Sequence, residues 1–274
     1  MKIALLQMTS GVDPAANAEA LARGVAGAAA GGAVMLFTPE MSGLVDRDRA
    51  RAARSIMAED EDVSLAAVRQ AAALYGIWVH LGSLAVLRPD GKLANRGFVV
   101  DDHGNVRARY DKLHLFDVDL PTGESWRESA SYAAGEGACV VDTPVGALGL
   151  SICYDLRFPD LYRALSDAGA TMFAIPAAFT RPTGAAHWEL LQRARAIEAA
   201  AYVVAAAQTG SHADGRQTYG HSLVVDPWGD IILDMGDQPG LGFAEIDPAR
   251  TADVRARIPV LQHRRPIPSV EHKS

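Results

Sequence analysis

Residues 145–159, VGALGLSICYDLRFP, join an apolar run to a charged segment that ends at a proline. The run GALGLSIC predicts a buried strand, and residues 159–168 predict a helix that begins at the proline. Cys153, at the end of this strand, is one of only two cysteines in the chain. A free cysteine is most often a buried apolar side chain, so the position of Cys153 alone leaves its role open.

Strands and helices alternate on both sides of this stretch. Upstream, the predicted elements are strands over 2–8, 33–40 and 77–87, helices over 17–30 and 61–75, and a hairpin over 97–110 that turns at 102–105. Downstream, they are strands over 171–179, 202–208 and 242–246, a helix over 187–200, a hairpin over 221–233 and a short helix before a Pro-rich tail. Two such similar halves predict an α/β protein in which two mixed sheets stack face to face with helices outside.

Composition limits the function classes. The chain has 274 residues, of which 49% are hydrophobic and 22% charged, which is ordinary for a globular enzyme of one large domain over 1–274. The formal net charge of −7 argues against a nucleic-acid-binding protein. No apolar run is long enough for a membrane span, and MKIALLQMTSG lacks the features of a secretory signal. We therefore expect a cytoplasmic protein with reduced thiols, and two cysteines are too few for a disulfide framework or a CxxC zinc site.

Three chemically complementary residues lie at or near strand ends, where ligand sites of α/β sheets gather. Glu40 ends the run VMLFTP, Cys153 ends GLSI, and Lys112 follows the strand VRARY. A carboxylate with a raised pKa in a dry pocket can take the proton of a thiol. A lysine and a backbone N–H can stabilise the oxyanion that forms when the thiolate attacks a carbonyl or nitrile carbon. Spacing alone does not establish that the three side chains meet.

Four motifs, in order along the chain, strengthen this hypothesis. They are FTPEMSG around Glu40, YDKLHLFDVD around Lys112, WRES around Glu128, and SICYDLRFPDLYR around Cys153. With PAAFTRPTGAAHWELLQRARAIE, YGHSLVVDPWG and PVLQHRRP, they make the chain resemble the nitrilase superfamily of carbon–nitrogen hydrolases nearly end to end. The resemblance implies a four-layer α/β/β/α sandwich of nitrilase type.

The resemblance also implies roles for individual residues. Cys153 is the nucleophile that forms a thioester, and Glu40 is the general base and then the general acid. Lys112 stabilises the oxyanion together with the backbone N–H of Tyr154, while Glu128 orients the lysine. The family needs no metal and no organic cofactor, which agrees with a sequence that has no HExxH or P-loop motif.

Within the family the chain is most similar to the Nit branch, whose amidases act on deaminated glutathione or on ω-amides of 2-oxo acids. YGHSLVVDPWG and QHRRP favour the first group. The expected reaction is hydrolysis of an amide C–N bond in a small carboxylate-bearing substrate. Alternatives are an ω-amidase for 2-oxoglutaramate-like substrates, an N-carbamoyl amide hydrolase, and a non-catalytic binding subunit, although the intact motifs argue against the last. Family members associate, so a homodimer or larger oligomer is expected, with the C-terminal extension from about residue 258 in its contacts.

Arg157 and three histidines are further candidates. Arg157 follows Cys153 by four residues and either binds a substrate carboxylate or pairs with Asp155 or Asp160. His114, His187 and His221 would suit a Cys–His hydrolase, but each is more typical of a structural histidine. His114 is kept as a candidate for substrate binding because its loop is expected to border the pocket.

Aromatic and small side chains complete the predicted pocket. Phe116, Phe179 and Thr180 are expected to line it, with Trp188 as a further wall residue, although Phe179 and Trp188 suit the core equally well. Cys139, in the alternating segment ACVVDTP, is expected to pack in the core.

Three aspartates need separate interpretations. Asp117 and Asp119 could suggest a metal ligand pair, but carboxylates that alternate in a polar loop are usually solvated. Asp111 stands where members of the branch often carry a basic residue, so it is a departure from the family pattern outside the four catalytic positions.

Overall fold

The structure is a computed structural model that describes residues 1–119, 123 and 125–273. The first half contains β1 (Lys2–Gln7), α1 (Pro14–Ala30), β2 (Met35–Phe37), α2 (Arg49–Ala52), η1 (Glu59–Glu61), α3 (Val63–Tyr75), β3 (Trp78–Leu87), β4 (Leu93–Val100) and β5 (Val106–Asp111). A connecting segment contains β6 (Asp117–Asp119), β7 (Ser125–Arg127) and η2 (Glu128–Ala130). The second half contains β8 (Val140–Thr143), β9 (Gly146–Leu150), η3 (Cys153–Arg157), α4 (Pro159–Asp167), β10 (Met172–Ala174), α5 (Arg181–Ala199), β11 (Tyr202–Ala205), β12 (Thr209–Ser211), β13 (Gln217–Tyr219), β14 (Leu223–Val225), β15 (Ile231–Asp234), β16 (Gly240–Glu245) and α6 (Pro248–Arg257).

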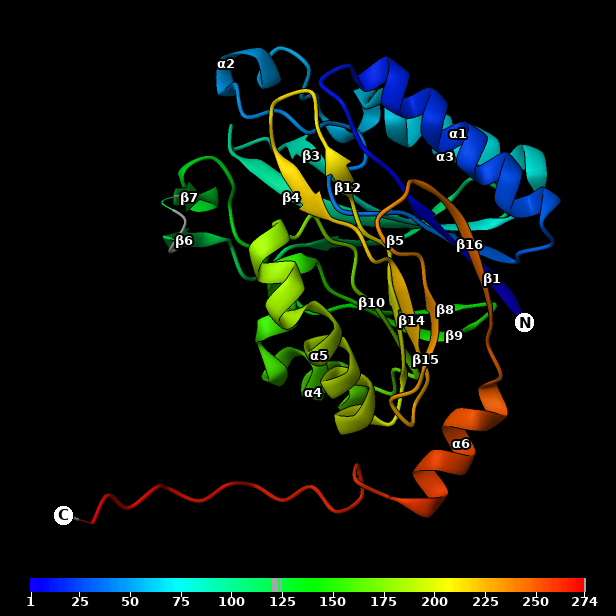
Figure 1. The fold of residues 1–274 in the computed structure, drawn as a ribbon, viewed down its shortest axis with the longest axis vertical. Helices are drawn as coiled ribbons and strands as arrows, with labels where there is room; N and C mark the ends of the chain where they lie inside the picture. Colours follow the sequence, from blue (N-terminus) through cyan, green and yellow to red (C-terminus); the bar gives the residue numbers. More distant parts are fainter. Residues whose placement is uncertain (120–122, 124, 274) are drawn as a thin grey trace.

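Two six-stranded sheets form the centre of the molecule (Figure 1). The first has the order β16-β1-β2-β3-β4-β5, and the second has the order β15-β14-β11-β10-β9-β8. In each sheet three consecutive parallel strands are extended by antiparallel strands. The predicted repeat of one architecture in two halves is therefore confirmed, and the mixed strand directions follow from combining helical crossovers with hairpins.

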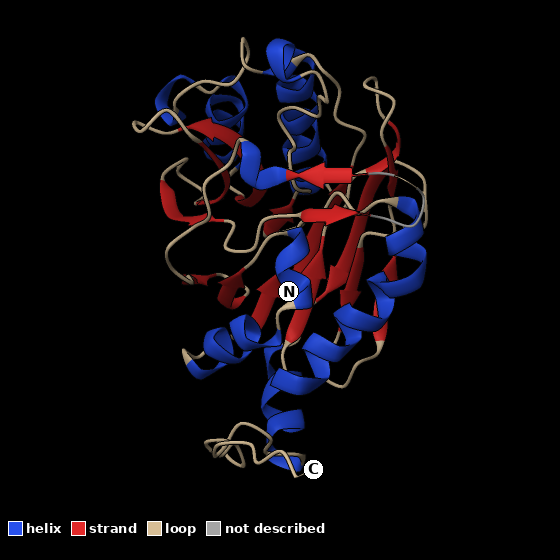
Figure 2. Cartoon of the chain, turned by 90° about the vertical axis from the view of Figure 1, so that its left-hand side faces the viewer, coloured by secondary structure: helices blue, strands red, loops and turns tan. Residues whose placement is uncertain are grey.

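The layers follow from the period-two alternation of buried side chains. On β1, Ile3 and Leu5 belong to the core shared with the second sheet, whereas Ala4 and Leu6 pack with residues of α1 and α3. Both faces of β1 are thus apolar, as expected for a strand covered on each side. Helices α4 and α5 pack against the second sheet, and Figure 2 shows the strands inside and the helices outside. The predicted α/β/β/α sandwich is confirmed.

Two helices begin earlier than the sequence pattern predicts. Helix α1 starts at Pro14 instead of residue 17, because the Asp13 side chain accepts a hydrogen bond from the Ala15 N–H and Pro14 takes the first helical position. Helix α5 starts at Arg181 instead of residue 187, again with a proline in its first turn. In both cases the proline signal is in the sequence, but the apolar periodicity begins three residues later in the first helix and six residues later in the second.

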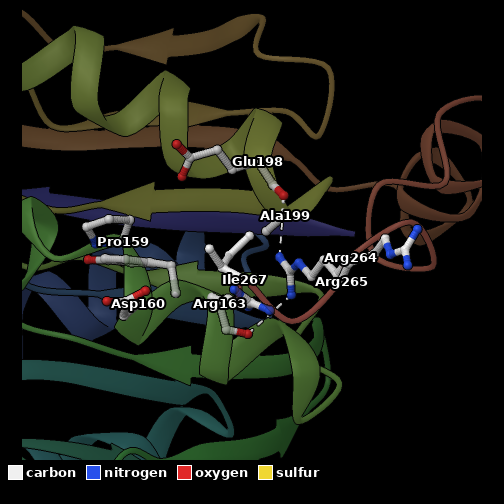
Figure 3. A pocket seen from close by; sticks show the side chains of 9 residues that line it. Pro159, Asp160, Arg163, Glu198, Ala199, Arg264, Arg265 and Ile267 are labelled. Carbon is white, nitrogen blue, oxygen red and sulfur yellow. Dashed lines mark hydrogen bonds between the residues drawn. The ribbon is translucent and has the colours of Figure 1, made fainter. Parts of the chain in front are cut away.

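The C-terminal segment runs along α4 and α5, beyond α6 (Figure 3). Arg264 anchors it by donating hydrogen bonds to Ser166 Oγ (2.9 Å) and to the Asp167 carboxylate. A shallow cavity of about 300 Å³ lies between this segment and the two helices. Further on, Ile267 and Val270 are 77% and 89% exposed, so the segment leaves apolar side chains without cover within the chain. Among the described residues no helix is both long and apolar enough to cross a membrane.

Candidate active site

Cys153 is the first residue of helix η3, and two residues separate it from the end of β9. Its backbone has φ +50°, a left-handed conformation that is uncommon for a residue other than glycine. Its N–H donates to the carbonyl oxygen of Pro176 (2.9 Å), which fixes this residue against the end of β10. Strained backbone of this kind concentrates at functional sites, where the surrounding structure holds it in place. The side chain is buried at 8% exposure.

Glu40 extends from the end of β2 into the same region. Its Oε1 accepts hydrogen bonds from Lys112 Nζ and Asn95 Nδ2, both at 2.9 Å, and its Oε2 accepts one from the Ala178 N–H at 2.9 Å. The carboxylate lies close enough to the Cys153 thiol that each group shifts the pKa of the other. One carboxylate therefore accepts from an ammonium, a side-chain amide and a backbone N–H at once, with the thiol beside it.

Lys112 and Glu128 complete a buried cluster with these two residues. Lys112 Nζ donates to Glu128 Oε2 (2.9 Å) and Oε1 (3.2 Å), and Glu128 Oε2 also accepts from the Phe116 N–H. The side chains of Lys112, Glu40 and Glu128 are 3%, 6% and 14% exposed. The structure thus brings together all four residues singled out at the motif centres, although they come from four separate parts of the chain.

The balance of charges sets the protonation of the cluster. Burial alone would raise the pKa of Glu40, but Lys112, Cys153 and Asn95 together hold it below its ordinary value. Burial and the neighbouring Glu40 carboxylate raise the pKa of the Cys153 thiol well above its ordinary value. Burial opposes the charge on Lys112, yet Glu128 and Glu40 raise the pKa of its ammonium well above the usual value. The expectation of a base with a raised pKa was therefore wrong, because a buried lysine compensates the desolvation of Glu40.

Asn95, on β4, was missed in the sequence. Its Nδ2 donates to both Glu40 Oε1 (2.9 Å) and Glu128 Oε1 (3.1 Å), so it bridges the two carboxylates. A neutral donor between two negative groups reduces their repulsion without adding charge. The available signal was a polar amide in the otherwise apolar strand LANRGFVV, where it is 2% exposed.

Asp155 ties the Cys153 loop to the segment that carries Lys112. Its Oδ2 accepts from Tyr110 Oη (2.7 Å), and its Oδ1 lies 2.7 Å from His114 Nδ1 and accepts from the His114 N–H (3.0 Å). The His114 ring also stacks on Phe158 with centroids 3.6 Å apart. His114 therefore has partners on its ring face and on Nδ1, an arrangement typical of a positioning residue.

Arg157 makes neither of the two ion pairs considered for it. Within the described part of the chain it pairs with no carboxylate, and its guanidinium lies 3.3 Å from His187 Nδ1. Its Cζ lies 6.0 Å from the Tyr154 ring centroid and 5.6 Å from that of Phe179. The Arg157 guanidinium thus keeps N–H donors for a ligand next to Tyr154, the residue that follows Cys153.

The predicted wall residues divide between one partly buried position, Phe116, and buried positions. The ring of Phe116 lies edge-on to Tyr154 at 5.1 Å. Phe179 is 7% exposed and packs on Trp188, which is a core residue at 1% exposure. Thr180 precedes the first residue of α5 and pairs its hydroxyl with that of Thr183 at 2.8 Å.

The aspartates near the site hold its surroundings in place. Asp117 accepts hydrogen bonds from Ser129, and Asp119 forms an ion pair with Arg127, so both fix the segment around Glu128. Asp111, the departure from the family pattern, forms two hydrogen bonds with Arg96 at 2.6 and 2.9 Å.

The remaining candidates lie outside the cluster. Cys139 is half-buried and packs against the core, and His221 lies 3.1 Å from the Asp234 carboxylate. The one group of metal-type ligands within the described residues is formed by Asp101, Asp102 and His103, in the turn between β4 and β5. That turn does not include Asp117 or Asp119.

Comparison with known proteins places this arrangement in a family. The sequence model of the carbon–nitrogen hydrolases matches residues 2–256. A deaminated glutathione amidase of Synechocystis sp. is 51% identical over 176 residues, which are 64% of this chain and 65% of that protein. The human deaminated glutathione amidase is 41% identical over 269 residues, covering 96% of this chain and 82% of the human protein.

Solved structures agree with the sequence relatives. The crystal structure of the Caenorhabditis elegans NitFhit protein matches with a TM-score of 0.89 and 41% identity, covering 96% of this chain and 65% of that chain. The matched region thus spans just under two thirds of the Synechocystis and worm proteins. Because the family model and the human relative both extend over nearly the whole chain, the chain belongs to the carbon–nitrogen hydrolase family and is an amidase of that family.

Proposed function

We propose that the protein hydrolyses a small carboxylate-bearing amide of the deaminated glutathione type, through a thioester on Cys153. The observation that carries this proposal is the buried cluster in which the Glu40 carboxylate accepts from the Lys112 ammonium and lies beside the Cys153 thiol, whose pKa it raises. The names of the relatives supply the substrate class.

The first half-reaction forms the thioester. Glu40 takes the proton of the Cys153 thiol while the sulfur attacks the amide carbon, so the S–C bond forms as the carbonyl becomes an oxyanion. Glu40 then gives that proton to the departing nitrogen, and the C–N bond breaks. The lowered pKa of Glu40 keeps it ionised at rest, and the raised pKa of the thiol keeps the sulfur protonated until substrate is present.

The second half-reaction releases the acid. Glu40 removes a proton from water, which attacks the thioester carbon, and the C–S bond breaks as Cys153 regains its proton. Glu40 thus serves as base in both halves and as acid between them. Glu128 keeps Lys112 in place, since its carboxylate is within hydrogen-bond distance of Nζ through both oxygens.

Two donors would stabilise the oxyanion. Lys112 has three N–H donors, so it can turn one toward the developing charge while it keeps a bond to each glutamate. The Tyr154 N–H lies in the first turn of η3, where backbone N–H groups have no partner within the helix. The residue that follows the nucleophile is well placed for this role because Cys153 itself is held at a sharp bend.

Arg157 would bind a carboxylate of the substrate. A guanidinium offers planar paired donors that match a carboxylate, and within the described residues no carboxylate occupies it. Phe116, Phe179 and Thr180 would form the adjoining walls, and His114 would hold the wall through Asp155.

Replacement of the two cysteines tests this proposal. We expect Cys153→Ala to lose hydrolysis of deaminated glutathione by on the order of 10⁴- to 10⁶-fold, because no other group forms the thioester. Cys139→Ala is the matched control, since Cys139 lies outside the cluster and should keep wild-type activity. The 2-oxo acid product is measured, and the thioester is trapped by mass spectrometry of the intact protein. Activity that survives in Cys153→Ala would remove the nucleophile assignment, whereas a wild type active only on 2-oxoglutaramate would identify an ω-amidase.

We also propose a cytoplasmic homo-oligomer. Both cysteines are free thiols, which suits a reducing compartment. The C-terminal segment from about residue 258 leaves Ile267 and Val270 exposed beside α4 and α5, as a segment used in contacts between copies would. Sedimentation of the full chain and of a chain ending at residue 258 measures this contribution.

A further inference from the structure

A second group of cationic and aromatic side chains lies beside the buried cluster. Arg216, the residue before β13, places its Cζ 4.8 Å from the ring centroid of Trp126 on β7. Arg47 approaches the same ring, with its Cζ at 5.2 Å. Two guanidinium groups therefore share one indole, an arrangement that is attractive for each cation but leaves their positive charges close together.

Two hydrogen-bond donors in this group are buried and unsatisfied. Trp126 Nε1 and Arg216 Nε have no partner in the described part of the chain. Both groups can only donate, so only an acceptor can satisfy them. A buried donor without a partner is costly, and in a native structure it usually marks a position that a ligand or water completes.

Asp214 forms an ion pair with Arg216 but leaves the Arg216 Nε–H without an acceptor. Its Oδ2 lies 3.6 Å from Arg216 Nη2, which is beyond hydrogen-bond distance, and this oxygen is itself unpartnered. Burial lowers the pKa of Arg216, and the charge of Arg47 lowers it further while Asp214 opposes the effect. An added anion would therefore satisfy the orphaned donors of Trp126 and Arg216.

This group adjoins the catalytic residues. Trp126 precedes Glu128 by two residues, and its ring lies 6.3 Å from that of Phe116, whose N–H donates to Glu128. Phe116 in turn contacts Tyr154, and Arg157 lies over Tyr154 on the second-half side. An aromatic row of Trp126, Phe116 and Tyr154 thus has a guanidinium at each end.

We propose that Arg216 and the indole N–H of Trp126 bind a second carboxylate of the substrate, one carried by the amine that leaves. The inference rests on the proposed function, in which Arg157 binds the carboxylate of the acyl part. The substrate class is then an amide with an anion on each side of the scissile bond, such as a 2-oxo acid joined to a peptide. A primary ω-amide, which releases ammonia, carries no group for this subsite.

Paired substrates and variants test the subsite. The substrates are deaminated glutathione, the same compound with its terminal carboxylate converted to a carboxamide, and 2-oxoglutaramate. We expect wild type to prefer the carboxylate form over the carboxamide by about 10- to 100-fold in kcat/KM, the size of a charge-assisted hydrogen bond. In Arg216→Met this preference should disappear, while kcat/KM for the carboxamide and for 2-oxoglutaramate stays within about 3-fold of wild type.

Two further variants keep the test decisive. Trp126→Phe keeps a six-membered aromatic ring and removes the pyrrole ring with its N–H, so it should lose part of the preference while an aromatic face remains against Arg216. Arg107→Met removes an exposed arginine that pairs with Asp101 and should change nothing. Equal activity of wild type on the carboxylate and the carboxamide would overturn the subsite, as would a uniform loss on all substrates in Arg216→Met. Inactivity of wild type on every substrate would instead overturn the proposed function.

Discussion

The two halves of the molecule share one strand order but supply different chemistry. After β2 the chain continues through Pro39 to Glu40, and after β10 it continues through Pro176 to Ala178. The first half contributes the carboxylate and ammonium of Glu40 and Lys112, and the second contributes the thiol of Cys153 and the N–H of Ala178. Segments that follow strands thus carry the proposed acid–base groups in the first half and the proposed nucleophile in the second. The architecture provides the positions, and the residues at the strand ends determine the reaction.

Direct hydrogen bonds join the two halves. Asp155 joins the Cys153 loop to Tyr110 and His114 of the first half. At Gly82 on β3, a Cβ would lie 2.1 Å from the Thr38 carbonyl oxygen and 2.6 Å from Pro176 Cβ. Both sheets therefore approach this glycine closely, and the catalytic geometry depends on that approach.

Among changes to the first half, removing the proposed base should have the largest effect. Glu40→Gln keeps the size of the side chain but cannot accept the thiol proton, so we expect kcat/KM to fall by about 10²- to 10⁴-fold. Glu61→Gln, at an exposed position of the same half, is the control and should leave activity unchanged. The readout is hydrolysis of deaminated glutathione. A Glu40→Gln variant with near-normal activity would show that another group activates Cys153.

The next largest effect should come from a substitution at Gly82, where the two sheets approach each other. Gly82→Ala places a Cβ against two backbone oxygens that cannot turn away, so we expect a loss of about 1–3 kcal/mol in the free energy of unfolding, together with reduced activity. Gly137→Ala adds the same methyl where no atom lies within 4 Å and should be neutral. Denaturant unfolding measures both variants. Equal stability of the two would mean that the sheets can move apart at β3 without cost.

Replacing Asn95, the neutral side chain that bridges Glu40 and Glu128, by an aspartate should have a smaller effect on kcat/KM. Asn95→Asp adds a third carboxylate beside Glu40 and Glu128, and like charge raises the pKa of a carboxyl group. We expect the acid limb of kcat/KM to move to higher pH, with a loss of about 10-fold at neutral pH. Asn105→Asp, at the exposed β4–β5 turn, adds the same charge away from the cluster. An acid limb that shifts equally in both variants would point to net charge as the cause.

The strands could be predicted from the sequence, but neither their ends nor the contacts between them could. The runs predicted to end at Glu40 and Cys153 end at Phe37 and Leu150 in the structure. The apolar runs that lead to Glu40 and Cys153 indicate their place in a sheet, and the motifs around them indicated the family. Nothing local predicts that the Ala178 N–H reaches Glu40, because the two residues are 138 positions apart.

The lowered pKa of Glu40 is a tertiary property of the same kind. It depends on Lys112, Cys153 and Asn95, which arrive from other strands. The pairing of Trp126 with Arg216 likewise joins two loops whose sequences carry no shared pattern.

The smallest effect should be that of pH on the kcat/KM of the wild type. The pKa of Glu40 lies below its ordinary value of 4.5, and that of Cys153 lies well above 9.0, so neither titrates between these limits. We expect this pair to keep one protonation state from about pH 5 to 9, so that kcat/KM stays constant over that range. The acid limb should lie below pH 4.5, where Glu40 takes up a proton. The same signs apply to stability. Glu40 contributes above pH 4.5 and its contribution is lost as pH falls through its lowered pKa, while Cys153 contributes below pH 9.0 and its contribution is lost as pH rises through its raised pKa.

A profile with a limb near neutral pH would contradict this account in an informative way. A limb that disappears in Cys153→Ser would mean that the thiol ionises before substrate binds, as in an ion pair with Lys112. The second half would then hold a preformed nucleophile, and Glu40 would act only as the acid that protonates the leaving amine. Persistence of a flat profile in the Cys139→Ala variant, which has a single thiol, would instead show that the first half must take the proton of Cys153 during the attack itself.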